Sequence, residues 1–313
     1  MKKILFILST VMLLNSNSGA QTTTPTAPAE TPKQEEFDKK YRFGLKVSPQ
    51  PTWYKSNNTN SKGAGSTFGF GFGLLLDIKL SKIIHFTSGL GGDFEGGYVK
   101  YNFVSDVVNP GNDFQVNVVV DKENNLVEAK DGIVSTDYEF VNGSTQYVLN
   151  ERKYKTTFVS IPLMLKMMTQ EYGGLKYFFN FGGELGIRAG VKANDTYVAG
   201  IKTSITGTSV TTASVAAADL KRDDINVGKD ASTLPFRVGM NLGLGTEYRL
   251  GGSTSLLFSV NYFQSFTNLM KKDSKYLTKG VDNTYTSSGG WNFASLNQGY
   301  FARAIRINIG IMF

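Results

Sequence analysis

Residues 68–80 read FGFGFGLLLDIKL, an alternation that few kinds of protein can accommodate. Every even position carries a large apolar side chain, whereas the odd positions carry three glycines, Leu75, Asp77 and Lys79. A period of two predicts a β-strand whose two faces meet different surroundings. A strand on a water-soluble core turns a polar face to water, and glycine is poorly suited to that face. A sheet with hydrocarbon on one side and its own narrow interior on the other accounts for both faces.

The same alternation recurs along the chain and predicts eight strands. The expected segments are Tyr41–Trp53, Phe68–Leu80, Ile83–Phe103, Tyr154–Met168, Leu175–Lys192, Leu234–Leu250, Ser253–Phe266 and Phe301–Phe313. Because no strand edge can stay unpaired in lipid, these segments predict a closed structure. We therefore expect an all-β fold, an eight-stranded antiparallel up-and-down transmembrane β-barrel.

The connections between the expected strands alternate in length. Tight turns are expected at Ser81-Lys82, Thr169–Gly174 and Gly251-Gly252. The other connections are expected to be longer, at Tyr54–Ala64, Val104–Lys153, Ala193–Thr233 and Thr267–Tyr300. Short periplasmic turns and longer extracellular loops are typical of outer-membrane barrels. The sequence 114–134, FQVNVVV–DKENN–LVEAKDGIV, predicts a hairpin inside the second long loop.

The start of the chain and its composition set further bounds. Residues 1–20 have a basic start, an apolar run and a small-residue cleavage site, which predicts a signal peptide. Residues 21–40, rich in Thr, Pro and acidic side chains, predict a disordered periplasmic linker, with the barrel domain at 41–313. No later segment is long and apolar enough for a membrane-spanning helix. The chain has no cysteine, so no disulfide or thiolate site is expected.

The charge of the chain does not favour a nucleic-acid partner. The formal net charge is +7 and falls to +5 when the signal peptide is removed. This surplus is spread along the sequence rather than gathered in a basic patch.

Several segments resemble a known family. Phe158–Met167 (FVSIPLMLKM) and Tyr177–Gly190 (YFFNFGGELGIRAG) resemble strands of the PorT-like outer-membrane β-barrel domain of Bacteroidota, and Arg42–Pro49 and Phe236–Leu250 fit the same pattern. The resemblance covers about Tyr41–Phe313 and implies an outer-membrane barrel in a Bacteroidota-like Gram-negative bacterium. One named member type serves in protein secretion, but the loops here depart from any family pattern, so no residue-level role is carried over.

Charged residues on the expected inward faces form the first set of candidate site residues. They include Asp77, Lys166, Glu184, Arg188, Arg237, Glu247 and Arg306. Buried charges are costly unless paired, and an eight-stranded barrel is just wide enough for side chains to fill it. We therefore expect an interior ionic network that fills the lumen. An ion path or binding site is the alternative.

The remaining candidates concern assembly, catalysis and partner binding. Phe313, which closes an alternating C-terminal strand, predicts recognition by the outer-membrane assembly machinery. His85 is the only histidine, and with no evident orienting carboxylate it does not predict a catalytic triad. The last long loop is rich in aromatic side chains, which can mark a partner surface: Tyr276, Tyr285, Trp291 and Phe293.

These features predict a non-enzymatic outer-membrane protein without cofactor or metal. Its expected role is that of an envelope scaffold or accessory, with protein secretion as one process it could serve. The alternative is a surface binding or adhesion barrel that acts through its extracellular loops. Expected partners are outer-membrane lipid, the assembly machinery, and other envelope or secretion proteins.

Overall fold

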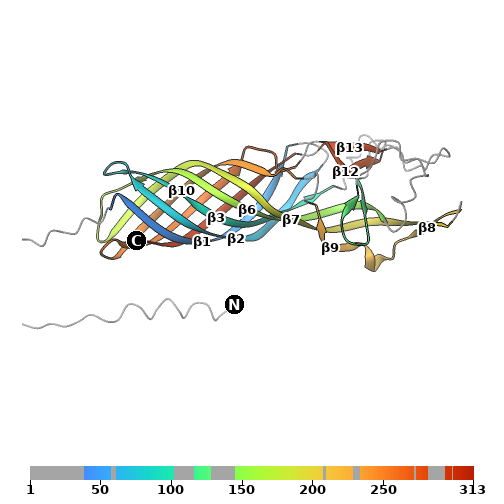
Figure 1. The fold of residues 1–313 in the computed structure, drawn as a ribbon, viewed down its shortest axis with the longest axis horizontal. Helices are drawn as coiled ribbons and strands as arrows, with labels where there is room; N and C mark the ends of the chain where they lie inside the picture. Colours follow the sequence, from blue (N-terminus) through green and yellow to red (C-terminus); the bar gives the residue numbers. More distant parts are fainter. Residues whose placement is uncertain are drawn as a thin grey trace, which may run out of the picture. The chain divides into compact units, whose positions relative to one another are not determined.

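A computed structural model describes residues 39–57, 61–101, 116–127, 145–206, 209–227, 233–270, 273–280, 293–297 and 299–313. Within them, eight long antiparallel strands close into a barrel, which confirms the predicted fold (Figure 1). The barrel strands are β1 (Tyr41–Ser56), β2 (Lys62–Lys79), β3 (Ile84–Lys100), β6 (Thr145–Met168), β7 (Leu175–Thr206), β10 (Phe236–Gly251), β11 (Thr254–Ser265) and β14 (Tyr300–Met312).

Each barrel strand pairs with its neighbour in the chain order of the barrel strands. The pairing of the first barrel strand, β1, with the last, β14, completes the ring. Gly44 lies opposite Met312 where the first and last strands meet, so every barrel strand has a partner on both sides. A closed ring satisfies the backbone hydrogen bonds without water, as a bilayer core requires.

The two faces of the barrel wall differ as the alternation predicts. On β2, Phe68, Phe70, Phe72 and Leu74 are exposed on the outer face, whereas the glycines between them are buried on the inner face. Larger side chains would not fit at these glycine positions: a Cβ atom added to Gly71 would lie 2.6 Å from Oδ1 of Asp93. Glycine here makes room for inward charged side chains from other strands.

Short connections gather at one end of the barrel. They are residues 80–83, 169–174 and 252–253. At the other end, the connections 101–144, 207–235 and 266–299 are long, but the one between β1 and β2 is not. The prediction of a long first loop at 54–64 was wrong, because both strands extend further and leave only 57–61 between them. In the described part of the chain, no helix is long and apolar enough to cross a bilayer.

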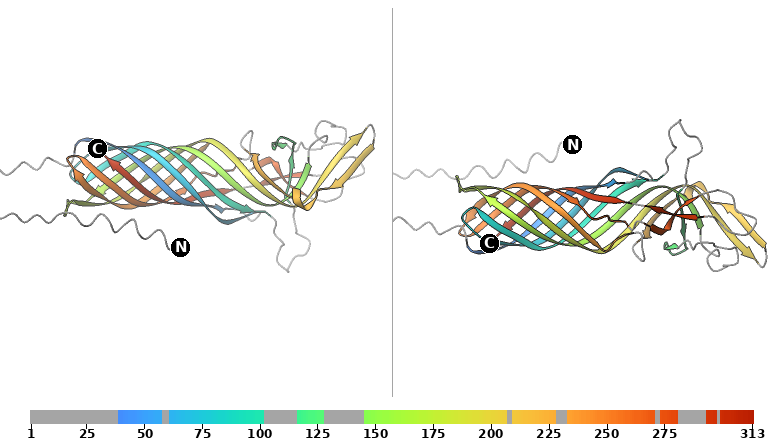
Figure 2. Two further views of the ribbon diagram at one scale, coloured as in Figure 1. Left: turned by 90° about the horizontal axis from the view of Figure 1, so that it is seen from below. Right: turned by 90° about the horizontal axis from the view of Figure 1, so that it is seen from above.

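Two barrel strands continue well beyond the wall. β6 begins nine residues before the predicted start at Tyr154, and β7 runs past the predicted end at Lys192 to Thr206. Figure 2 shows the far end of β7 and its partner there, β8 (Ser209–Ser214), forming a ribbon that projects from the long-loop end. Smaller elements pack around this extension: β4 (Val116–Val120), β5 (Leu126–Val127), β8 (Ser209–Ser214), the short 3-10 helix η1 (Ala217–Asp219), β9 (Lys221–Asn226), β12 (Asp273–Gly280) and β13 (Phe293–Asn297).

Candidate functional site

The interior of the barrel is the candidate site, because it brings together charged side chains from most of the barrel strands. Inward positions on β1, β2, β3, β6, β7, β10 and β14 all contribute a charge that is almost fully buried. The charges separate into two groups along the barrel axis. On β10, for example, Glu247 lies towards the short-turn end and Arg237 towards the long-loop end.

The group near the short turns, which we call the lower cluster, contains Arg42, Asp77, Lys166, Glu247 and His85. Nη1 of Arg42 donates to Oε2 of Glu247 at 2.8 Å, and Lys166 donates to the other oxygen of the same carboxylate. Nζ of Lys166 also lies 3.7 Å from Oδ2 of Asp77. Each carboxylate thus has a cation beside it, in a region where an unpaired ion would be costly.

His85 is part of the lower cluster. Its Nδ1 lies 3.1 Å from Oδ2 of Asp77, and Thr87 donates to Oδ1 of the same carboxylate at 2.8 Å. The orienting carboxylate that the sequence did not reveal is therefore present. The imidazole is only 1% exposed, however, and within the described residues its Nε2 has no hydrogen-bond partner. A nucleophile hydrogen-bonded to Nε2, which a catalytic triad requires, is not among the described contacts.

The group nearer the long loops, which we call the upper cluster, contains Asp93, Glu95, Glu184, Arg237 and Arg306. Both guanidinium groups bind Glu184: Nη2 of Arg237 and Nη2 of Arg306 each donate to its Oε1 at 3.0 Å. Arg306 also donates to Oε1 of Glu95 at 2.9 Å, and Arg237 donates to Oε2 of Glu95. Charge-assisted contacts of this kind are the strongest hydrogen bonds that proteins make.

Aromatic rings hold the two arginines of the upper cluster from the long-loop side. The guanidinium carbon of Arg237 lies 4.2 Å from the ring centre of Phe158 and 4.4 Å from that of Phe263. Arg306 lies 4.5 Å from the same Phe263 ring. Cation–π contacts of desolvated arginines add to the ion pairs and fix the guanidinium planes.

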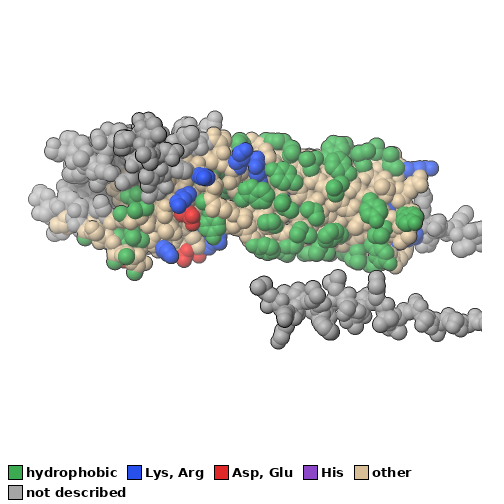
Figure 3. Space-filling view, turned by 180° about the vertical axis from the view of Figure 1, so that it is seen from behind, with side chains coloured by type: hydrophobic (Ala, Val, Ile, Leu, Met, Phe, Trp, Pro, Cys, Tyr) green, Lys and Arg blue, Asp and Glu red, His purple; other side chains and the backbone are tan. Residues whose placement is uncertain are grey.

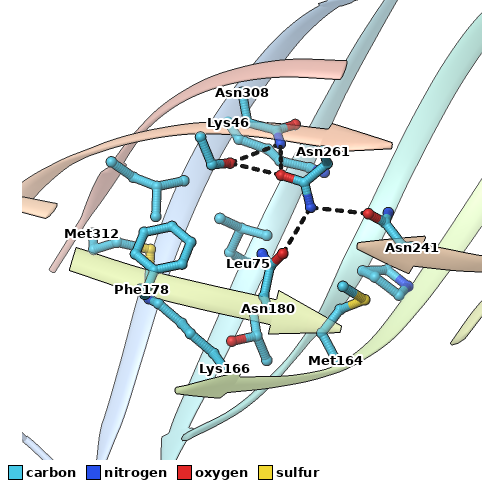
Figure 4. A pocket seen from close by; sticks show the side chains of 14 residues that line it. Lys46, Leu75, Met164, Lys166, Phe178, Asn180, Asn241, Asn261, Asn308 and Met312 are labelled. Carbon is cyan, nitrogen blue, oxygen red and sulfur yellow. Dashed lines mark hydrogen bonds between the residues drawn. The ribbon is translucent and has the colours of Figure 1, made fainter. Parts of the chain in front are cut away.

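A belt of asparagines lies between the two clusters: on β10, Asn241 stands between Arg237 and Glu247. Figure 4 shows the hydrogen-bonded side chains of this belt. Nδ2 of Asn261 donates to Oδ1 of Asn180 at 3.0 Å and to Oδ1 of Asn241 at 2.9 Å, and Asn308 donates to Oδ1 of Asn261 at 2.9 Å. Beside the belt lies a cavity of about 50 Å³, which Lys46 also lines. This space is large enough for water but small for an organic ligand.

An apolar plug follows the upper cluster towards the long loops. It is a buried cluster that includes Val116, Val118 and Val120 of β4, Leu269 and Met270, and tyrosines of the barrel wall. The predicted hairpin therefore exists in its described part, where Val120 lies opposite Leu126. It is packed inward rather than standing free, because every residue of β4 is buried.

A further buried ion pair, which the sequence analysis missed, anchors the extension. Nε and Nη2 of Arg152 donate to the two oxygens of Asp195, each at 2.6 Å, and the Tyr197 hydroxyl donates to Oδ2 at 3.1 Å. Burial and the neighbouring Asp195 carboxylate raise the pKa of the Tyr197 phenol, so it remains a neutral donor. The sequence signal for this pair is the alternation on β6 before Tyr154, which is hard to see because charged residues occupy both faces of the strand there.

Arg188 does not join either cluster, contrary to the predicted network. Its Nη1 donates to the backbone oxygen of Thr233 at 2.7 Å and to the Thr233 hydroxyl. A bulge in β7 follows directly: Phe158 of β6 lies opposite Arg188, but the preceding residue, Thr157, lies opposite Gly190, so Ala189 is an extra residue. The extra residue reverses which of the later positions face inward, so Val191 is buried although Leu185 and Ile187, which share its odd-numbered parity, are exposed.

The other predicted site residues lie as follows. Phe313 directly follows β14, is exposed and donates its backbone N–H to the oxygen of Phe43 at 2.7 Å. Tyr276 lies half-buried on β12, and Phe293 is the first residue of β13. Tyr285 and Trp291 lie outside the described residues. No group of three or more potential metal ligands occurs among the residues that the structure describes.

Comparison with known proteins places this geometry among outer-membrane barrels. A family model described as "Outer membrane protein beta-barrel domain" matches residues 20–271. No curated protein matches the chain. Similar solved structures include Neisserial surface protein A (9% identity, 86% of this chain and 95% of that one covered, TM-score 0.33). They also include OprG from Pseudomonas aeruginosa (10%, 87% and 94%, TM-score 0.35) and the outer membrane protease OmpT from Escherichia coli (9%, 87% and 96%, TM-score 0.33).

Proposed function

Because the chain belongs to the outer membrane protein β-barrel domain family, we propose that it is a closed, non-conducting barrel that anchors an extracellular structure in the outer membrane. The observation that carries this proposal is the succession of layers in the lumen. The lower cluster, the asparagine belt, the upper cluster and the apolar plug follow one another along the axis. We propose no catalytic activity for this interior.

The two clusters support the closed state because their charged side chains are paired with one another. A conducting pore holds charged side chains beside water, where each can solvate a passing ion. In the upper cluster, Asp93, Glu95 and Glu184 instead direct their oxygens at Arg237 and Arg306. An ion entering this region would have to displace contacts that are buried and charge-assisted.

Planar-bilayer recording tests the closed state. The purified full chain should give no stable conductance steps. A conducting porin recorded in the same bilayers shows that the assay detects an open lumen. Stable steps from the unaltered protein would refute the proposal.

We further propose an accessory role in the envelope, with protein secretion as a process that the barrel could serve. The support is the PorT-like character of Phe158–Met167 and Tyr177–Gly190, which also suggests a Bacteroidota source. Gentle solubilisation of the outer membrane tests this role. A stable envelope partner should co-purify with the barrel, and a protein that always purified alone would contradict it.

Surface binding through the extension is the second candidate. It is favoured by the length of β7 beyond the wall and by the β7–β8 ribbon, where Ile201 lies opposite Ser214. Deletion of residues 198–219 should abolish binding to host or neighbouring cells, while heat-modifiable gel migration of the barrel persists. Unchanged binding after this deletion would exclude the ribbon as the binding element.

A further inference from the structure

Cations gather on the outer face of the barrel where the apolar belt ends towards the long loops. Figure 3 shows apolar side chains covering the barrel on the face seen, with Lys and Arg side chains at the border of this belt. Each of the following side chains is exposed or half-buried at the long-loop end of a barrel strand: Lys55, Lys62, Lys100, Lys153, Lys155, Arg188 and Lys192. The outward carboxylates in this region are fewer, and include Glu151 and Asp224.

Two pairs of these lysines lie directly opposite each other on neighbouring strands. Lys155 of β6 lies opposite Lys192 of β7, and Lys62 of β2 lies opposite Lys100 of β3. Like charges directly opposite each other in a sheet are destabilising. In the part of the chain that the structure describes, no carboxylate ion-pairs with Lys62, Lys100 or Lys192. An anion from outside the protein would remove this repulsion.

One of the lysine pairs borders an open cleft of about 730 Å³ beside the β7 bulge. Lys155, Arg188 and Lys192 line this cleft together with Asp224 and Glu123, which leaves one positive charge in excess. Nζ of Lys155 lies 3.2 Å from Oδ1 of Asp224, and both side chains are about half exposed. An exposed pair of this kind contributes little and can exchange for another anion.

The cleft lies directly against the apolar belt. Val159 of β6 is four residues from Lys155, and its side chain is 38% exposed on the same outer face. Ile187 precedes Arg188 on β7 and is 50% exposed, and Phe236 lies opposite Ile187 and is 63% exposed. A molecule that combines a phosphate with acyl chains could place its phosphate against the cations of the cleft and its acyl chains against the apolar belt beside it.

We propose that this cleft and the neighbouring lysines bind the phosphate groups of lipids in the outer leaflet. Guanidinium and ammonium groups are the donors that phosphate oxygens prefer. Basic pockets at the membrane border bind phosphorylated lipid head groups in the same way. The lipid would surround the barrel as a bound ring and set its depth in the membrane. This inference does not depend on whether the lumen is closed.

The test compares lipid binding by the full-length protein and two double variants in an uncharged detergent. The first variant is Lys155→Gln with Lys192→Gln. The matched control is Lys40→Gln with Lys82→Gln, which removes two exposed lysines at the short-turn end. Native mass spectrometry measures the affinity for bis-phosphorylated lipid A, for chemically dephosphorylated lipid A and for inorganic phosphate.

We expect the unaltered protein to bind phosphorylated lipid A about tenfold more tightly than the dephosphorylated form, a difference of about 1.4 kcal/mol. The first variant should lose this preference, and the control should keep it. Equal binding of the two lipids by the unaltered protein, or equal loss in the control, would overturn the proposal. Binding of inorganic phosphate as tight as that of the lipid would overturn the lipid as its source.

Thermal unfolding in the uncharged detergent checks that the first variant folds. Because removing the Lys155–Lys192 pair relieves repulsion, the variant should unfold at the same temperature as the unaltered protein or a higher one. A markedly lower unfolding temperature without lipid would show that these lysines act within the protein, which would contradict the proposal.

Discussion

Glu184 is the most highly connected carboxylate of the upper cluster, and removing it gives the sharpest test of the interior. It accepts four hydrogen bonds: two from Arg306, one from Arg237 and one from Asn241. Glu184→Ala would leave both guanidinium groups buried with fewer partners. The change also leaves space in the lumen that the surrounding barrel wall cannot close.

The expected cost in unfolding free energy follows from the buried ion pairs that this substitution removes. Removing one partner of a buried ion pair typically costs about 3–5 kcal/mol, because the remaining charge stays buried. Asp93 and Glu95 still face the arginines, so we expect the lower end of this range, about 3 kcal/mol. This corresponds to a rise of about a hundredfold in the unfolding equilibrium constant.

A double-mutant cycle separates the pair from the general effect of truncation. Glu184→Ala with Arg306→Ala should cost less than the two single changes together, with a coupling of about 1–3 kcal/mol. Glu151→Ala removes a partly exposed carboxylate from the outer face of β6 and should change stability by less than about 0.5 kcal/mol.

Urea unfolding in lipid vesicles, followed by tryptophan fluorescence, measures these free energies. Trp53 lies on β1 and reports on the barrel wall. A cost below about 1 kcal/mol for Glu184→Ala, or full additivity in the double mutant, would refute the account of the upper cluster as a coupled buried network.

Three further changes test other parts of the structure. Gly243→Ala should lower the free energy of unfolding by about 1–3 kcal/mol, because its Cβ would lie 2.4 Å from asparagine side chains of the belt. The control is Gly183→Ala, whose Cβ would have no neighbour nearer than 3.9 Å and which should be nearly neutral in the same unfolding assay. Arg152→Lys removes the bidentate hydrogen bonding to Asp195 and should destabilise the extension by about 1–3 kcal/mol. The loss should appear as faster amide hydrogen exchange in β6 and β7 beyond the barrel wall, and unchanged exchange would contradict the anchoring role. Ile307→Arg places a charge on the lipid face and should cost about 2–4 kcal/mol in vesicles; a cost near zero would show that this face does not meet hydrocarbon.

The barrel itself could be predicted from the sequence because alternation is a local property. Phe68 to Leu74 show it without interruption, and parity then assigns each charge to a face. Parity led to Asp77, Lys166 and Glu247, which the structure brings together, and to Glu184, Arg237 and Arg306, which form the second group. Arg42 sits on an inward position of β1 in the same way and was overlooked.

Two features of the interior depend on events that leave no clear signal in the sequence. The extra residue Ala189 in β7 shifts its pairing with β6 by one residue, so parity failed for Val191. Arg188 precedes this residue, and its side chain turns to Thr233 instead of the clusters. The packing of Val116–Val120 into the long-loop end depends on contacts between segments far apart in the chain. Alternation alone cannot say whether such a segment lies outside the barrel or within it.

The central claim is that one sheet is closed with its alternating side chains facing lipid and lumen in turn. The absence of cysteine in the chain allows single cysteines to be placed one at a time and spin-labelled in lipid vesicles. Labels at Phe70, Phe72 and Leu74 should be highly accessible to oxygen dissolved in the bilayer, and a label at the inward Leu75 should not. Equal accessibility at Leu74 and Leu75, or greater access at the phenylalanines to a water-soluble relaxation agent than to oxygen, would contradict the account.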